Sequence, residues 1–368
     1  MSLHLLSAEQ QEIRALARRF ADEKIAPHAA AWDRDHTFPR ELFGELGELG
    51  LMGTCVPEEH GGAGADFLAY VLVLEELSRA DAGVGVTVAV HTSACTLPLL
   101  DHGSEYVAAL ASGEEIGAFA LTEAGSGSDA SAMRTRYADG AITGTKQWIT
   151  NGSHASTFIV FAREGARISA FVVRAGADGF EVTREEEKLG LNSSSTADIR
   201  FDATPAERLG EAGKGMSIAL RTLDTGRIGI ASQAVGIAQA ALDLATAYAQ
   251  ERHAFGGPIA KLGAIQQKLA DMQTEIEAAR ALTWRAARLK DAGLPHAVEG
   301  AQAKLFASGV ARRQTGEAIQ VLGGYGYTKE FPAERYYRDA KVTEIYEGTS
   351  EIQRLVIARA LLGEAMRG

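Results

Sequence analysis

The chain of 368 residues has very few cysteines and no excess of basic residues. Its two cysteines, Cys55 and Cys95, are too few for a disulfide framework or a cysteine-based zinc site, so we expect no metal. Two thiols suit a reducing compartment, and we expect a cytoplasmic protein. The net charge of −11 argues against nucleic acid as the main partner, because phosphate binding needs a basic face. A local basic pocket for a phosphorylated cofactor remains compatible with this charge.

Long apolar runs and targeting signals are also missing. No stretch of eighteen consecutive apolar residues occurs, so we expect no membrane span. The first residues, Met-Ser-Leu-His-Leu-Leu-Ser, lack the basic region and apolar core of a signal peptide. There is no internal repeat and no low-complexity tail. With 46% hydrophobic and 23% charged residues, the composition is that of an ordinary globular protein of two or three domains.

Hydrophobic periodicity divides the chain into helical, strand-rich and again helical parts. The first helix follows a capping box at Ser7–Gln10, and the pair Glu75–Glu76 is expected to end the apolar face of the third. The expected helices of the first part cover residues 8–26, 40–49, 66–78, 83–100 and 104–111. Short strands separated by turn residues then suggest an antiparallel barrel or sandwich. The expected strands cover residues 117–121, 137–143, 147–149, 157–161, 168–173 and 195–201. Long helices are expected over residues 215–250, 262–291, 296–322 and 349–362, and the many small residues of the first would allow close packing.

The stretch Ile-Tyr-Glu-Gly-Thr-Ser-Glu-Ile-Gln-Arg at residues 345–354 places a glutamate just before a helix. Thr349 or Ser350 can cap that helix. Burial beside apolar neighbours would raise the pKa of Glu347 and make it a useful base near neutral pH. The alternative is an ordinary surface glutamate, which the helix dipole favours at this end.

Four other stretches could carry chemistry. The Gly-Ser-rich loop at residues 121–129 suits a flat polar ligand or a phosphate, or it is a flexible surface loop. Trp148 and Thr150 are expected on one face of a strand, beside a ring system or in the core. Arg252, next to a Gly-Gly-Pro turn, suits a pyrophosphate. The glycines after Gln320 suit a close ligand or a plain helix end.

Asp224 and Arg227 lie three residues apart on the long helix and could form a simple ion pair. Together, these motifs resemble in order those of the acyl-CoA dehydrogenases, flavoenzymes that form the α,β double bond of acyl-CoA thioesters in fatty acid or amino acid catabolism. The resemblance implies a mainly α fold with a β domain. It would have an N-terminal α-helical domain (1–115), an antiparallel β-barrel-like domain (116–210) and a C-terminal four-helix bundle (211–368). It also implies a homotetramer built as a dimer of dimers.

The resemblance implies site residues position by position. Glu347 matches the catalytic base, and Gly226 occupies the place where other branches carry theirs. The positions that match cofactor contacts are Leu121, Thr122, Ser128, Trp148, Ile149, Thr150, Arg252, Phe255, Gln320, Val321, Gly323, Gly324, Thr349 and Glu351. The positions that match substrate contacts are Ser128, Asp224, Arg227 and Gly348. Of these, Arg252, Phe255 and residues 320–324 match contacts made across a dimer to the neighbour's cofactor. Gly263 departs from the family's usual glutamine, and residues 202–212 resemble a shortened connection from the β domain to the long helix.

The reaction that the resemblance implies uses FAD. Glu347 would remove the α-proton while the β-hydrogen leaves as hydride to flavin N5, and an electron-transfer flavoprotein would accept the electrons. Three alternatives stay open: an oxidase of the same fold that uses O₂, a dehydrogenase of a carrier-protein thioester, and a non-catalytic scaffold that binds FAD or acyl-CoA. Purified protein without yellow colour would favour the scaffold. The sequence does not give the length or branching of the acyl chain.

Overall fold

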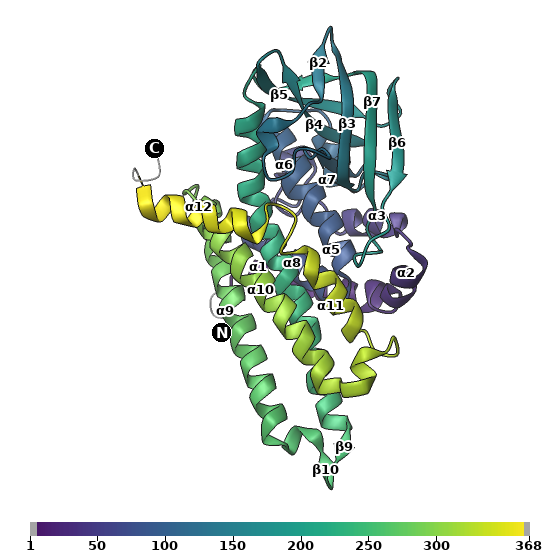
Figure 1. Cartoon of the computed structure of the whole chain (residues 1–368), viewed down its shortest axis with the longest axis vertical. Helices are drawn as coiled ribbons and strands as arrows, with labels where there is room; N and C mark the ends of the chain where they lie inside the picture. Colours follow the sequence, from purple (N-terminus) through teal and green to yellow (C-terminus); the bar gives the residue numbers. More distant parts are fainter. Residues whose placement is uncertain (1–5, 364–368) are drawn as a thin grey trace.

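The computed structural model describes residues 6–363, with a sheet at one end of the molecule and long helices at the other (Figure 1). The N-terminal part is helical, as predicted. Its elements are α1 (Ala8–Phe20), a π-helical turn (Ala21–Ile25), α2 (Ala29–Asp35), α3 (Arg40–Glu48), α4 (Phe67–Ala80), α5 (Ala82–Ala89), a π-helical segment (Val90–Thr96), α6 (Leu97–Asp101) and α7 (Val107–Ala111). The last helix starts later than predicted, because Glu105 and Tyr106 form a turn.

The capping box at the start of α1 is confirmed, since Ser7 and Gln10 each accept a hydrogen bond from the backbone amide of the other. The prediction that Glu75 and Glu76 end the apolar face of α4 was wrong. Both are buried, at 2% and 0% exposure, inside the helix. Glu76 forms ion pairs with Arg14 at 2.7 Å and with Arg18 at 2.9 Å. These distant arginines make burial of a carboxylate possible.

Two helical stretches have the length and composition of a membrane span, Ala82–Asp101 and Gly215–Glu251. Neither stretch is an uninterrupted run of apolar residues; each passes by length and mean hydropathy alone. In their most apolar windows, 89% and 83% of the residues are buried inside the protein. They are core helices here, and the hydrophobic stretch predicted over residues 83–100 is confirmed as a buried helix.

Strands β1 to β8 form one sheet in the order β6-β7-β3-β2-β4-β5-β8, and β1 pairs with β4. Their bounds are β1 (Gly117–Ala120), β2 (Arg136–Ala138), β3 (Ala141–Thr150), β4 (Thr157–Glu164), β5 (Arg167–Arg174), β6 (Phe180–Glu185), β7 (Thr196–Pro205) and β8 (Glu207–Leu209). The pairing is antiparallel except that β4 runs parallel to β1 and, over a single residue pair, to β2. The antiparallel β domain is thus confirmed with two parallel contacts in it.

Three details of the sheet differ from the prediction. The expected strand at 137–143 is two strands, because Asp139 and Gly140 have φ of 52° and 86° and turn the chain between β2 and β3. The expected connection at 202–212 contains the end of β7 and all of β8. Strand β6 was missed, since most of its side chains are exposed and give no apolar alternation.

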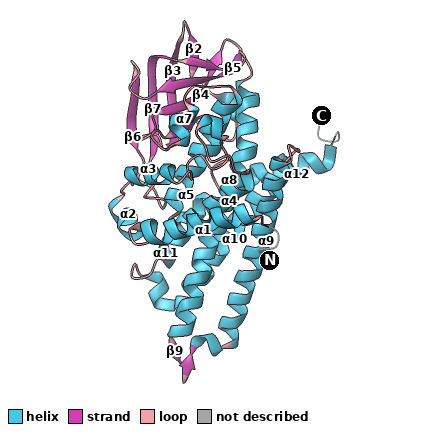
Figure 2. Cartoon of the chain, turned by 180° about the vertical axis from the view of Figure 1, so that it is seen from behind, coloured by secondary structure: helices cyan, strands magenta, loops and turns pink. Residues whose placement is uncertain are grey.

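The C-terminal part is built on α8 (Gly215–Glu251), which begins beside the sheet and runs to the hairpin at the opposite end (Figures 1 and 2). The other elements are β9 (His253–Ala254), β10 (Gly257–Pro258), a 3-10 turn (Ile259–Lys261), α9 (Gly263–Asp291), α10 (Ala297–Leu322), a 3-10 segment (Gly323–Tyr327), α11 (Ala333–Val342) and α12 (Ser350–Leu362). Close packing of α8 is confirmed at Gly236, where a Cβ atom would lie 2.4 Å from the Glu75 carbonyl oxygen of α4.

A polar junction ties the loop before β7 to both helical parts. The Leu191 amide donates to Asp339 of α11 at 2.7 Å, and the Asn192 amide group donates to Asp33 of α2 at 2.9 Å. The Ser193 hydroxyl donates to Asp81, which caps α5. Burial raises the pKa of Asp339 to about 7. The loop at residues 191–193 is therefore held by three separate elements.

Candidate active site

The turn at residues 346–348 precedes α12 and has an unusual backbone. Glu347 and Gly348 both adopt left-handed conformations, with φ of 52° and 88°. Glycine does so readily, but a glutamate does so rarely. Thr349 then caps α12 by accepting the Ile352 amide at 3.4 Å, which confirms the predicted cap. A strained non-glycine residue of this kind is typical of functional sites.

The carboxylate of Glu347 is buried, although the residue as a whole is partly exposed. Its Oε2 atom has no hydrogen-bond partner among residues 6–363. Burial raises the pKa of Glu347 to about 7, while the charges of Arg227 and Lys304 oppose that rise. A carboxyl group with such a pKa can accept a proton from a substrate near neutral pH.

Gly226 of α8 lies directly against this carboxylate. A Cβ atom on Gly226 would be 2.8 Å from Glu347 Oε2 and 3.2 Å from its Cδ. These distances are too short for an unshifted side chain, so the absence of a side chain on α8 makes room for the glutamate. The two positions singled out from the sequence are therefore neighbours in space.

Two residues that sequence reasoning missed hold the same turn. Lys304 of α10 is fully buried, and its Nζ donates to the Gly348 carbonyl at 2.7 Å. Gln353 of α12 donates to the same carbonyl at 2.7 Å and to the Glu347 carbonyl at 3.2 Å. The only sequence signal for Lys304 was a lysine on an otherwise apolar helix face, beside Ala303 and Ala307.

Arg227 and Asp224 form the ion pair that their spacing allows, at 2.6 Å. The Arg227 side chain is 5% exposed, and its Nε atom has no partner among the described residues. Burial raises the pKa of Asp224, and the Arg227 charge opposes this. A buried guanidinium with an unused donor could serve an anionic or carbonyl group.

The loop after β1 is fixed by a buried ion pair. Lys146 donates to Glu123 at 2.9 Å and to the Leu121 carbonyl at 2.9 Å. The Glu123 carboxylate also accepts the amides of Arg134 at 2.6 Å and Thr135 at 3.0 Å. Sequence reasoning gave neither Lys146 nor Glu123 a role. Their bonds hold the backbone next to Thr122 in one conformation.

Trp148 lies at an irregularity in β3. The register with β7 shifts between Lys146 and Ile149, and Trp148 has φ of 58°. The simple alternation expected to place Trp148 and Thr150 on one face is therefore interrupted by a bulge. Trp148 is 55% exposed, whereas Ile149 is buried. A core position for Trp148 is excluded.

These residues fit the isoalloxazine ring of FAD. The indole of Trp148 offers an exposed flat surface, and Thr122 and Thr150 are only partly buried. A Cβ on Gly125 or Gly127 would meet nothing within 4 Å, so the loop leaves open space for a ligand. Ser128 is exposed in the same loop.

The other predicted cofactor residues lie far from this loop. Arg252 and Phe255 belong to the hairpin at the end of the bundle opposite the sheet (Figure 1). Phe255 is 94% exposed, and Arg252 lies 6.0 Å from the ring of Tyr325. The end of α10 and the glycines that follow it lie near the hairpin. Of the predicted residues there, Val321 is buried, whereas Gln320, Gly323 and Gly324 are exposed. Within one chain, the structure brings Glu347 together with Gly226 and Arg227, but it does not bring the hairpin to Trp148.

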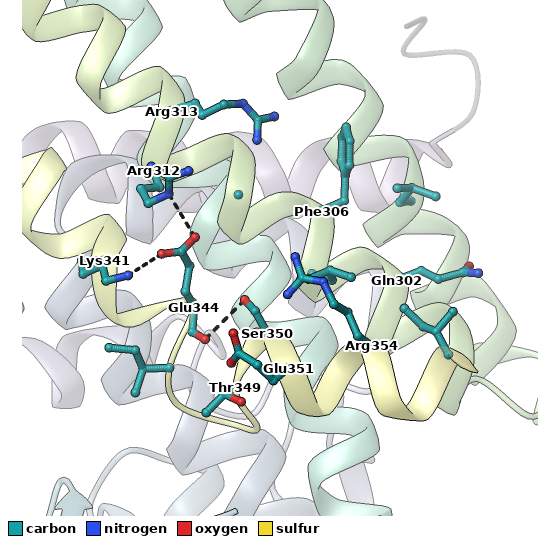
Figure 3. Close-up of a pocket in the computed structure, with 15 residues that line it drawn as sticks. Gln302, Phe306, Arg312, Arg313, Lys341, Glu344, Thr349, Ser350, Glu351 and Arg354 are labelled. Carbon is teal, nitrogen blue, oxygen red and sulfur yellow. Dashed lines mark hydrogen bonds and ion pairs between the residues drawn. The ribbon is translucent and has the colours of Figure 1, made fainter. Parts of the chain in front are cut away.

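A cavity of about 990 Å³ lies between α10 and the start of α12 (Figure 3). Thr349 and Glu351 line it, whereas Glu347 is not among its lining residues. Glu344 forms ion pairs there with Arg312 at 3.1 Å and Lys341 at 2.7 Å (Figure 3). The helix start thus separates a charged outer cavity from the base on its inner side. Among residues 6–363, no group of three or more His, Cys, Asp or Glu could hold a metal.

Comparisons with known proteins cover most of the chain. Residues 7–114, 118–204 and 213–362 match the N-terminal, middle and C-terminal domains of acyl-CoA dehydrogenase. The chain is 51% identical to the mitochondrial short-chain specific acyl-CoA dehydrogenase of Bos taurus, covering 97% of this chain and 91% of that protein. It is 45% identical to the short-chain specific acyl-CoA dehydrogenase of Clostridium acetobutylicum, covering 96% and 98%.

Solved structures give the same result. The butyryl-CoA dehydrogenase of Megasphaera elsdenii superposes with a TM-score of 0.94 at 42% identity, covering 97% of this chain and 99% of that chain. A chain from a structural study of the electron transferring flavoprotein of Acidaminococcus fermentans superposes with a TM-score of 0.96 at 44% identity, covering 99% and 100%.

Proposed function

Because the chain belongs to the acyl-CoA dehydrogenase family, we propose that it oxidises short-chain acyl-CoA thioesters with Glu347 as the catalytic base. The reaction class is FAD-dependent dehydrogenation of an acyl-CoA, with an electron-transfer flavoprotein as the acceptor. When bound, FAD supplies the two-electron redox chemistry that no side chain of this protein has. The residues of the chain position the thioester and handle its α-proton.

The observation that carries the role of Glu347 is its buried, unpartnered Oε2 beside Gly226. An oxygen without a hydrogen-bond partner can receive the α-proton directly. Burial keeps the pKa of Glu347 near 7, so the group can exist as a base and later as an acid at neutral pH. Arg227 and Lys304 favour its ionised form, and the Glu347 turn presents it from a strained backbone.

The replacement Glu347→Gln tests this role. The variant should keep FAD and bind acyl-CoA, but it should lose nearly all reduction of the flavin by substrate, because an amide cannot accept the proton. The matched control is Glu48→Gln, the same chemical change at an exposed position in the end of α3. Normal turnover by the Glu347→Gln variant would refute the assignment.

A short acyl chain is proposed from the names of the relatives, which are short-chain specific enzymes. A screen of acyl-CoAs from four to sixteen carbons, together with branched ones, with an artificial electron acceptor measures the preference. Highest activity on long or branched chains would contradict the proposal.

The remaining binding residues are proposed as three sets. Leu121, Thr122, Ser128, Trp148, Ile149, Thr150, Thr349 and Glu351 would hold FAD within one subunit. Ser128, Asp224, Arg227 and Gly348 would hold the acyl-CoA. Arg252, Phe255, Gln320, Val321, Gly323 and Gly324 would hold the FAD of a neighbouring subunit. The distance of the hairpin from the sheet supports this division, since one chain cannot supply both FAD-binding sets to the same cofactor (Figure 1).

A homotetramer is proposed as the assembly. Phe255 is 94% exposed, and Leu361 and Leu362 of α12 are 80% and 54% exposed, which is costly for a monomer in water. Sedimentation of the purified enzyme would give its mass, and Arg252→Ala should lower FAD retention without changing that mass. A monomer that retains FAD would contradict the proposal.

The domain boundaries and the location remain proposals as well. We propose domains over residues 1–115, 116–210 and 211–368, supported by the start of β1 at Gly117 and of α8 at Gly215. A cytoplasmic location is supported by the two unpaired cysteines, Cys55 and Cys95.

A further inference from the structure

A buried ammonium group lies beneath the turn that carries the base. Lys304 has no exposed surface, and its Nζ donates to the Gly348 carbonyl at 2.7 Å. Burying a charged amine is costly unless opposite charge or strong hydrogen bonds compensate. A neutral side chain could bond a carbonyl at lower cost, and Gln353 already donates to the same oxygen at 2.7 Å. The charge of Lys304 therefore needs a reason beyond this hydrogen bond.

The charges around Lys304 supply that reason. Burial lowers the pKa of Lys304 to about 8, and the carboxylate of Glu347 is the strongest influence that opposes this. Glu344 and Glu351 act in the same direction from the outer side, whereas Arg227 of α8 acts against them. Lys304 thus lies in the field of the base, between α8 and the start of α12.

The groups that face Glu347 are few. Arg227 approaches from α8 and Lys304 from α10, and both favour the ionised carboxylate. The hydroxyls of Tyr70 on α4 and of Tyr346 are also near, but burial raises the pKa of each well above neutral pH, so both stay uncharged. Arg227 is paired with Asp224, which partly cancels its charge. Within residues 6–363, Lys304 forms no ion pair with a carboxylate; its hydrogen bond goes to the Gly348 carbonyl.

We propose that Lys304 is a positioning residue that fixes the Glu347–Gly348 turn and, through its charge, sets the pH range in which Glu347 works as a base. This inference rests on the proposed role of Glu347. The two roles of Lys304, its hydrogen bond to the turn and its charge, can be separated by experiment. Gln353 also donates a hydrogen bond to the turn but carries no charge. Lys304 itself does not contact the reacting atoms in this proposal.

The test is the pH dependence of flavin reduction by a short acyl-CoA in a single turnover. In the wild type, the rate should fall as the pH drops through about 7, where Glu347 becomes protonated. We call this fall in rate on the acidic side of the pH profile the acidic limb. In Lys304→Met, the midpoint of the acidic limb should move upward by about one pH unit, since loss of a nearby opposite charge raises a carboxyl pKa. The rate should be roughly five-fold lower at about pH 7 and close to wild type at about pH 9.

Gln353→Leu is the matched control. It removes a neutral donor from the same turn, so it should lower the rate by one factor at every pH and leave the limb in place. Lys304→Arg restores the charge and should return the limb toward the wild-type position. Lys304→Gln keeps a neutral donor for the Gly348 carbonyl and serves as the neutral variant if Lys304→Met does not fold.

The outcomes are distinct. A moved limb in the neutral variant and its return in Lys304→Arg support the inference. An unmoved limb in a folded, FAD-containing neutral variant overturns it. If Glu347→Gln retains full flavin reduction, the proposed base itself is wrong, and this result does not depend on any Lys304 variant.

Discussion

The contact between Gly226 and Glu347 makes a quantitative prediction for Gly226→Ala. The new methyl group would lie 2.8 Å from Oε2 and 3.2 Å from Cδ of Glu347. An unstrained contact needs about 3.5 Å, so the carboxylate must retreat by roughly half an ångström or more. Because a displacement of about 1 Å can cost 100-fold in rate, we expect roughly a tenfold loss of kcat.

The stability of Gly226→Ala should behave differently from its activity. The atom that must move is the end of a flexible side chain, so the folded state can accommodate it at low cost. Alanine also favours the interior of a helix over glycine by up to about 1 kcal/mol. The free energy of unfolding should therefore stay within about 1 kcal/mol of the wild type.

The assay is stopped-flow reduction of the bound flavin by butyryl-CoA, together with urea unfolding. The matched control is Gly316→Ala in α10, where the new methyl group would meet only Tyr337 at 3.7 Å, an ordinary contact. This control should keep its rate and gain a little stability. Wild-type flavin reduction in Gly226→Ala would refute the reasoning that the empty position on α8 sets the place of the base.

Three further predictions concern stability and cofactor retention. Glu347→Gln should be more stable than the wild type at about pH 8, by on the order of 1–3 kcal/mol, and equal to it at about pH 4 in thermal unfolding. The sign of this difference follows from the pKa of Glu347, which folding raises from the ordinary 4.5 to about 7. The wild type therefore loses stability as the pH rises through that interval, and the glutamine variant does not. Lys146→Met leaves the Glu123 carboxylate without its buried cation, so it should cost about 3–5 kcal/mol and release FAD more readily on gel filtration; unchanged flavin absorbance and urea midpoint would contradict this. Gly236→Ala should destabilise the protein by about 1–3 kcal/mol in urea, because its methyl group would meet the rigid Glu75 carbonyl at 2.4 Å; an unchanged midpoint would show that α4 and α8 can separate freely.

Local sequence signals predicted much of the fold. Ser7 and Thr349 cap the helices that their neighbours suggested. The order of helices, sheet and helices also followed from periodicity. What failed locally had a nonlocal cause: Glu76 is buried because Arg14, distant in sequence, reaches it. The bulge at Trp148 likewise depends on pairing with β7, which the sequence of β3 alone does not specify.

The candidate site was predicted only in part, because some of its contacts join residues that are far apart in the sequence. Glu347 and Gly226 were named from sequence motifs, and the structure places them in contact. Lys304 was missed because a lone lysine in a helix usually extends into solvent, and only the fold reveals that its end meets the Gly348 carbonyl. Arg252 and Phe255 were also named from a motif; their role as cofactor contacts stays a prediction, and Phe255 is 94% exposed.

The polar junction at residues 191–193 has a consequence for building hybrid enzymes. A sheet transplanted from a relative would bring its own version of this loop, but its partners Asp33, Asp81 and Asp339 would stay with the recipient. Each mismatch would remove one hydrogen-bond donor from a carboxylate that is buried (Asp81, Asp339) or partly buried (Asp33). Such chimeras should therefore fold only when these three acids are transplanted together with the sheet or when the recipient's acids already match the new loop. The junction thus limits which relatives can exchange their β domains.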